Sequence, residues 1–95
     1  RLIKIIIKSR DLDTLRIASN WLFQSLSNGF IYPIYGPLDP HISKIKNEFI
    51  KQILIKYPNT TVRNKIKKHL MKSVESFESI AKFRIVKLNV DVDPN

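Results

Sequence analysis

Lysine is the residue type whose number and spacing point to chemistry in this sequence. Of 95 residues, 17 are Lys or Arg and 8 are Asp or Glu, which gives a formal net charge of +9 at pH 7. Such a basic chain favours a polyanionic partner, either a nucleic acid or an anionic membrane surface. Mobile ammonium groups follow a phosphate backbone without reading its bases, and each phosphate contact releases a condensed counterion. The composition therefore predicts binding to a nucleic acid.

The basic residues that we expect to meet phosphates fall into two stretches of the chain. The first stretch follows a Gly-Pro segment, and the second coincides with a predicted helix. In that helix Lys65, Lys68 and Lys72 recur at i, i+3 and i+7, so they share one helical face. For any single lysine, an ordinary solvated surface position is the alternative interpretation. The candidate DNA-binding residues are Lys44, Lys46, Lys51, Lys56, Arg63, Lys65, Lys68, Lys72 and Lys87.

Aromatic side chains are the second type of residue that a single-strand binder requires, because bases stack on them. Tyr32 and Tyr35 are the better candidates, since they lie on a predicted edge strand beside a Pro-rich segment. An RNA-recognition motif needs a Gly- and aromatic-rich third strand. The matching stretch, FIKQILIKY, contains no glycine. The sequence therefore disfavours that motif.

The remaining polar residues do not predict an active site. His41 and His69 are isolated from each other and from carboxylates at metal-ligand spacing. Asp91 and Asp93 share a strand face, and paired carboxylates of this kind can bind a cation or act in acid–base catalysis. The simpler interpretation is that they end the strand and pair with nearby lysines. The chain has no cysteine and two glycines, which excludes thiolate chemistry and Gly-rich phosphate loops. We expect a domain that is not an enzyme and has no metal or cofactor of its own.

The apolar periodicity predicts four strands and two helices. Strands are expected at Leu2–Lys8, Phe30–Tyr35, Phe49–Tyr57 and Phe83–Val92. One helix runs from Thr14 to Asn28-Gly29 after a cap at Ser9 or Asp11, and the other opens at Asn59–Thr61. Gly36–Pro40 is expected to be a rigid turn or loop, and His41–Asn47 stays unassigned.

This order, β-α-β-β-α-β, predicts an α+β split βαβ fold in a single domain, residues 1–95. The sheet would have four antiparallel strands with both helices on one face, because each helix carries a single apolar stripe. The longest apolar runs are too short to span a membrane, and no secretory signal is recognisable. We therefore expect a cytoplasmic protein with no membrane partner. The first residue is Arg rather than Met, which suggests a piece of a longer protein.

Two motifs in order resemble a known family. One is IYGPLDPHISKIKNEFIKQILIKYP and the other is the terminal VKLNVDVDPN. The pattern resembles the C-terminal domain of bacterial replication restart helicases, the primosomal protein N′ (PriA) family, over residues 13–95. A departure is that many members carry an Arg-aromatic-Arg-Trp run where this chain has Glu48, Phe49, Ile50 and Lys51. The matching motif residues are Gly36, Pro37, Pro40, Asp91, Asp93 and Pro94.

The resemblance implies a function for the parent protein and for this domain. The parent would be an ATP-driven DNA helicase that holds ATP, magnesium and zinc in other domains and reloads the replicative helicase at abandoned forks. The domain itself would bind forked or single-stranded DNA. It would also help to form a pocket for the tail of single-stranded-DNA-binding protein, and it would meet other primosome proteins. Arg63, near the start of the second helix, is the candidate basic residue of that pocket.

Two other functions remain open from the sequence. The same lysines would suit a protein–protein docking module that binds an acidic peptide tail without contacting DNA. A ligand-sensing regulatory domain of the amino-acid-binding type would also share the fold, but it normally has a Gly-bearing turn after the first strand. The corresponding residues here, Ser9–Asp13, include no glycine.

Overall fold

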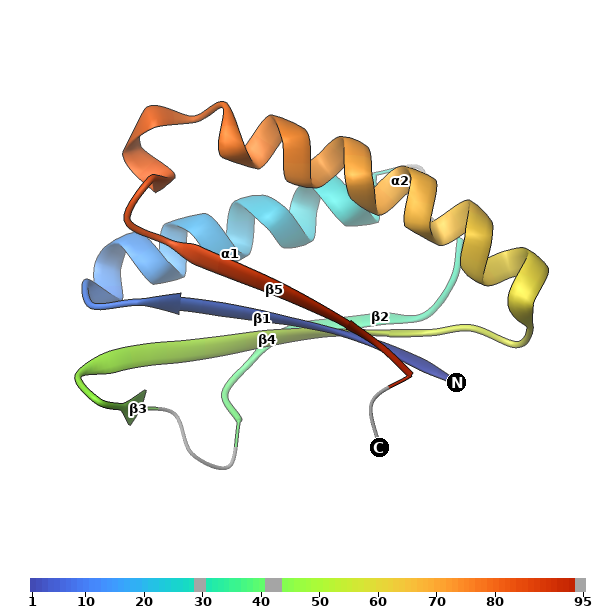
Figure 1. Ribbon diagram of the computed structural model, residues 1–95, viewed down its shortest axis with the longest axis horizontal. Coiled ribbons are helices and arrows are strands. Elements are labelled where there is room, and N and C mark those ends of the chain that lie inside the picture. Colours follow the sequence, from blue (N-terminus) through green and yellow to red (C-terminus); the bar gives the residue numbers. More distant parts are fainter. Residues whose placement is uncertain (29–30, 41–43, 94–95) are drawn as a thin grey trace.

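The chain folds as two layers, with both helices on one face of an antiparallel sheet (Figure 1). The computed structural model describes residues 1–28, 31–40 and 44–93. The strands follow the order β2-β4-β1-β5, and the short β3 pairs with β4. The predicted α+β fold is confirmed. Its elements are β1 (Leu2–Ser9), α1 (Leu12–Ser27), β2 (Ile34–Leu38), β3 (Lys44–Ile45), β4 (Glu48–Lys56), α2 (Thr60–Glu78), the 3-10 turn η1 (Ala81–Phe83) and β5 (Lys87–Val92).

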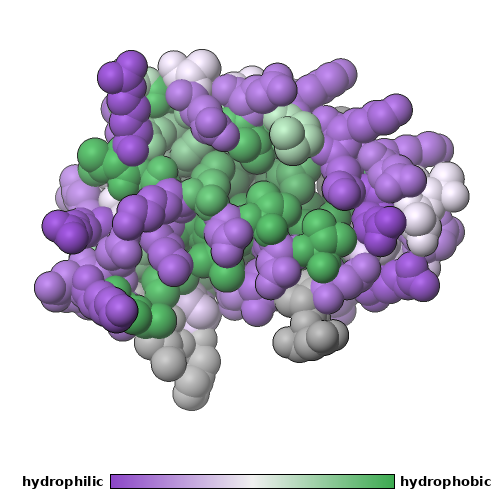
Figure 2. All heavy atoms as spheres, in the orientation of Figure 1, coloured by the Kyte–Doolittle hydropathy of each residue, from purple (hydrophilic) through white to green (hydrophobic). Residues whose placement is uncertain are grey.

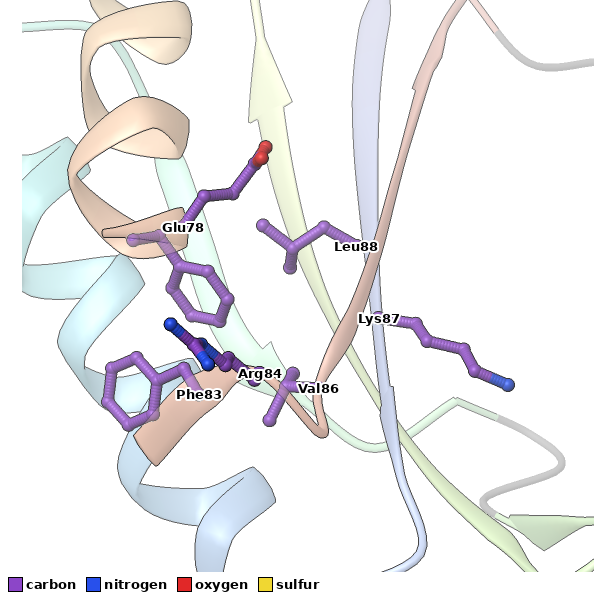
Figure 3. A pocket seen from close by; sticks show the side chains of 7 residues that line it. Glu78, Phe83, Arg84, Val86, Lys87 and Leu88 are labelled. Carbon is purple, nitrogen blue, oxygen red and sulfur yellow. The ribbon is translucent and has the colours of Figure 1, made fainter. Parts of the chain in front are cut away.

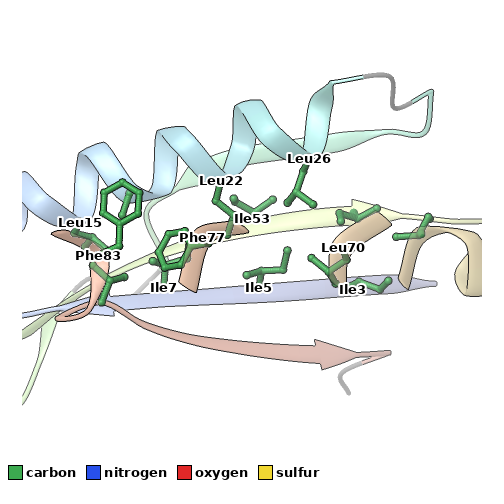
Figure 4. Close-up of a cluster of buried hydrophobic side chains, with 14 of the residues drawn as sticks. Ile3, Ile5, Ile7, Leu15, Leu22, Leu26, Ile53, Leu70, Phe77 and Phe83 are labelled. Carbon is green, nitrogen blue, oxygen red and sulfur yellow. The ribbon is translucent and has the colours of Figure 1, made fainter. Parts of the chain in front are cut away.

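The central strand β1 owes its position to alternating isoleucines. Ile3, Ile5 and Ile7 are fully buried, and the residues between them face the other side of the sheet. Ile5 and Ile3 lie opposite Ile53 and Ile55 of β4, which are also fully buried. These β-branched side chains form the floor of the core beneath the helices (Figure 4).

Each helix begins at a side-chain cap and buries one stripe. Asp11 accepts a hydrogen bond from the backbone N–H of Asp13, and Asn59 accepts one from Val62. The buried apolar residues of α1 are Leu15, Ala18, Leu22 and Leu26, and those of α2 are Ile66, Leu70 and Phe77. Because these positions recur every three or four residues, each helix keeps its opposite face in solvent. Neither helix is both long and apolar enough to cross a bilayer.

The second strand differs from the prediction. β2 begins at Ile34 and includes Gly36 and Pro37, which we expected in a turn, while Phe30 lies outside the described residues. The Gly36–Pro37 peptide is cis, and the pairing with β4 shifts register between Tyr35 and Leu38. Gly36 has φ +139°, and a Cβ there would lie 3.0 Å from the carbonyl oxygen of Gln52. The strand therefore continues through this irregularity because glycine lets the two backbones approach.

The last strand is shorter at its start than predicted. β5 begins at Lys87, whereas Phe83 belongs to η1. The Phe83 ring stacks on Phe77 with centroids 4.9 Å apart, and Trp21 contacts both rings at about 6 Å. This aromatic cluster of Trp21, Phe77 and Phe83 overrides the strand pattern. Leu88 and Val90 lie opposite Ile7 and Ile5, so they share the face of the sheet that the helices cover.

Candidate nucleic-acid interface

The candidate basic residues are divided between different parts of the fold. Lys65, Lys68 and Lys72 are exposed on α2, in the helical layer. Lys44 and Lys46 belong to the β3–β4 hairpin, and the remaining candidates lie on β4, on β5 and at the start of α2. In Figure 1 the hairpin and α2 lie on opposite sides of the molecule. The fold therefore does not gather all nine residues on one surface.

The α2 lysines form the most continuous basic surface, which we call the α2 stripe (Lys65, Lys68, Lys72). Residues three and four apart on a helix have their Cβ atoms about 5–6 Å apart, so these ammonium groups follow one another along the axis. Within the described part of the chain, no carboxylate lies within ion-pair distance of any of the three. Their charge is therefore directed at solvent and at whatever binds there.

Three other candidates already have carboxylate partners. Lys51 Nζ lies 2.6 Å from Asp39 Oδ1, and only 18% of its side chain is exposed. Lys87 Nζ lies 3.1 Å from Glu48 Oε2. Arg63 lies 3.8 Å from Asp93. These ion pairs reduce the positive charge that Lys51, Lys87 and Arg63 have left for phosphates.

The three remaining candidates, Lys44, Lys46 and Lys56, rest on aromatic rings or in a turn. Lys44 Nζ lies 4.9 Å from the centroid of the Phe49 ring, and Lys56 Nζ lies 5.4 Å from that of Tyr35. Lys46 is exposed in the β3–β4 turn with φ +51°. Tyr35 is 44% exposed and remains available for stacking, whereas Tyr32 packs against the core.

The terminal motif has a structural role that the sequence did not predict. Asp93 follows β5 with φ +52°, and its carboxylate accepts a hydrogen bond from the backbone N–H of Leu2 at 3.2 Å. Arg63 approaches the same carboxylate from α2, and Tyr57 approaches it from the end of β4. Asp93 thus joins β1, β5 and α2. Asp91 instead lies exposed opposite Lys4, and Pro94 lies outside the described residues.

This cluster shifts the ionisation of two of its members. Burial, followed by the neighbouring Asp93 carboxylate, raises the pKa of Tyr57. The Tyr57 hydroxyl makes the largest contribution to lowering the pKa of Asp93, and the Leu2 N–H and the charges of Arg1 and Arg63 act in the same direction. Both shifts favour a carboxylate beside a neutral phenol. The Asp93 carboxylate therefore stays ionised and has a structural role in the fold.

The remaining motif residues shape the edge of the sheet. Gly36 and Pro37 form the irregular centre of β2, and Pro40 lies over the open sheet face beside Ile50. His69 Nε2 donates a hydrogen bond to the carbonyl oxygen of Leu26 at 3.0 Å, which joins the two helices. His41 lies outside the described residues. Among the residues that are described, no group of three or more His, Asp or Glu side chains could hold a metal ion.

The chain is a small α+β domain with an exposed basic stripe on α2. The family model of the primosomal protein N C-terminal domain matches residues 1–95, and the chain belongs to that family. Its family places it among the proteins of primosome assembly and replication restart. No curated protein sequence matches the chain.

One solved structure with the same architecture is the de novo designed protein Foldit4. It aligns with a TM-score of 0.52 over 98% of this chain and 97% of its own, at 10% sequence identity. At this identity the likeness concerns the fold alone.

Proposed function

We propose that this chain is a non-catalytic DNA-binding domain that holds single-stranded or branched DNA during replication restart. The α2 stripe carries the proposal, since its three lysines face solvent on successive helical turns without a carboxylate partner in the described residues. A bound strand would place its phosphates along this stripe. Other cations, such as Lys56 beside the exposed Tyr35 ring, would add contacts away from α2.

Binding of this kind is electrostatic and independent of base sequence. Lysine is a mobile point charge, so it follows the strand backbone rather than reading base edges. Contact with about four to six phosphates predicts that log affinity for single strands falls against log salt with a slope of roughly −3 to −4. The ATP, magnesium and zinc of a parent helicase would belong to other domains. The tail of single-stranded-DNA-binding protein would be a further partner.

A direct test is a titration of the 95-residue chain with a labelled single strand and a labelled fork, followed by fluorescence anisotropy at several salt concentrations. We expect saturable binding at low salt that weakens with the slope given above. We expect similar affinity for strands of different sequence. Failure to bind either oligonucleotide in dilute buffer would exclude the proposal.

Docking of an acidic peptide is the second candidate function, and a cleft near β5 favours it. The cleft measures about 460 Å³, and Phe77, Phe83, Val86 and Leu88 supply its apolar walls. Figure 3 shows Arg84 beside these residues, but Lys87 points away and Glu78 points toward Leu88. The apolar walls and Arg84 would suit a tail that ends in Phe, whereas Glu78 would oppose its acidic residues, so this function has weaker support than DNA binding. A titration with an acidic peptide that ends in Phe, alongside DNA, separates the two functions.

A further inference from the structure

The outer edge of β5 is a regular strand edge without a partner in the described part of the chain. The opposite edge, β2, is interrupted by Pro37 and by its register shift. β5 has neither a proline nor a bulge between Lys87 and Val92, and Val90 is 38% exposed. Open edges of this kind readily pair with another strand, and native proteins usually protect them. The outer edge of β5 is therefore a candidate site for pairing with another strand.

The peptide groups of β5 alternate in direction, which fixes the residues that can pair outward. The backbone N–H of Asp93 donates to the carbonyl of Leu2, so odd-numbered residues of β5 direct their peptide groups toward β1. Leu88, Val90 and Val92 therefore direct theirs outward. An added antiparallel strand must form its hydrogen bonds with these even-numbered residues.

The sequence of β5 is self-complementary in one of the registers that this direction allows. If Leu88 of one copy pairs with Val90 of a second, then Asn89 lies opposite Asn89 and Lys87 lies opposite Asp91. The three polar residues lie on the open face of the sheet. Both Lys87–Asp91 pairs would join opposite charges, and the Lys87 side chain, 72% exposed, would share its ammonium between Glu48 and Asp91 of the other copy. Cross-strand pairs of opposite charge stabilise antiparallel strands. The same register places apolar Leu88 and Val90 together on the other face.

The side of α2 nearest β5 also has a charge distribution that is complementary to a second copy of itself. Arg63 meets Asp93 at one end of β5, and Glu78 borders the same cleft as Leu88 at the other, so this side runs alongside the strand. Its first half carries Arg63 and Lys67, and its second half carries Glu78. Met71, 56% exposed, lies midway. A twofold axis near Asn89 and Met71 would bring the basic half of one helix toward the acidic half of the other.

We propose that two copies of this chain associate through β5, antiparallel and with Asn89 on the twofold axis, to form one continuous sheet. Figure 2 shows the corresponding face, where apolar side chains gather between α2 and β5 and hydrophilic ones surround them. This arrangement is typical of an interface centre and rim. The α2 stripe lies on a different side of α2, so the proposal does not depend on DNA binding.

Cysteine cross-linking tests the register, because the chain has no cysteine of its own. On the axis, Asn89→Cys would place two thiols on directly opposed residues with Cα atoms about 4.5 Å apart, within the range of disulfides. Mild oxidation should convert this variant mainly to a covalent dimer. Lys87→Cys, which would face Asp91 rather than itself, is the matched control and should form little covalent dimer. Equal cross-linking of both variants would overturn the proposal.

Charge exchange provides a second test by sedimentation velocity. Wild type should shift from monomer toward dimer as its concentration rises. Lys87→Asp and Asp91→Lys should each dissociate at least about tenfold more readily, because each opposes like charges twice. An equimolar mixture of the two variants should recover the wild-type affinity. Wild type that stays monomeric up to about 1 mM, or a mixture no tighter than its components, contradicts the proposed interface.

Discussion

Two hydrogen bonds between Asp93 and Leu2 join the residue that follows β5 to the start of β1. The Asp93 N–H donates to the Leu2 carbonyl at 2.6 Å, and the Leu2 N–H donates to Asp93 Oδ1 at 3.2 Å. The second bond uses a side chain where the regular ladder has ended. Since Arg63 also meets this carboxylate, one residue ties the first strand, the last strand and the second helix together.

The charge of Asp93 should make the domain sensitive to acid. Its pKa is lowered in the folded chain, so its contribution to stability is complete above the unfolded pKa of about 3.9 and is lost as pH falls through the lower folded pKa. Asp93→Asn keeps an acceptor for Leu2 but removes the charge. We expect the variant to be less stable than wild type at pH 7, and the difference to close below about pH 4.

Urea unfolding followed by circular dichroism at several pH values measures this difference. Asp91→Asn is the matched control, since it removes an equal charge two residues away without touching Leu2 or Arg63. A gap between wild type and Asp93→Asn that stays constant from pH 7 to acid would mean that the carboxylate charge does not stabilise the fold.

Gly36 should be intolerant of any side chain. Alanine there would place a Cβ 3.0 Å from the Gln52 carbonyl oxygen at a φ of +139°. We expect Gly36→Ala to lower the free energy of unfolding by about 2 kcal/mol, because both the strain and the contact oppose it. Asn47→Gly, at φ +66°, tests the opposite case and should be neutral or slightly stabilising. Equal stability of Gly36→Ala and wild type would show that β2 can move away from β4.

Phe83 should contribute much of the stability that holds η1 onto the helices. Its buried ring stacks on Phe77 and meets Trp21 edge-on. Phe83→Ala should cost about 3–5 kcal/mol, measured by thermal or urea unfolding. Phe83→Leu, which preserves apolar volume, should cost less. A loss below about 1 kcal/mol for the alanine variant would show that this ring is dispensable for the fold.

The local patterns predicted the elements well where periodicity and caps agree. The alternation of Ile3, Ile5 and Ile7 and the caps at Asp11 and Asn59 are local features, so a single sequence contains them. The errors fall where tertiary contacts decide. Phe83 leaves its strand pattern for an aromatic cluster, and Gly36 with Pro37 continues β2 because β4 lies close beside it.

The candidate site was predictable as a set of cations but not as a surface. The i, i+3, i+7 spacing of the α2 stripe is visible in the sequence. The partners of Lys51, Arg63 and Lys87 are not, since Asp39, Asp93 and Glu48 lie 12, 30 and 39 positions away along the chain. These long-range ion pairs decide which basic residues can still bind phosphate and which are already neutralised by a carboxylate. A single sequence does not show them.

The most direct test of the account compares two triple variants that each remove three positive charges. Lys65→Ala/Lys68→Ala/Lys72→Ala removes the α2 stripe, and Lys44→Ala/Lys46→Ala/Lys56→Ala removes exposed lysines elsewhere. With a labelled single strand, the first should flatten the slope of log affinity against log salt by about two units, because each lost phosphate contact removes roughly 0.7. The second should change that slope by less than about one unit. Equal effects of the two variants, or an unchanged slope without the stripe, would contradict the assignment of α2 as the DNA-contacting surface.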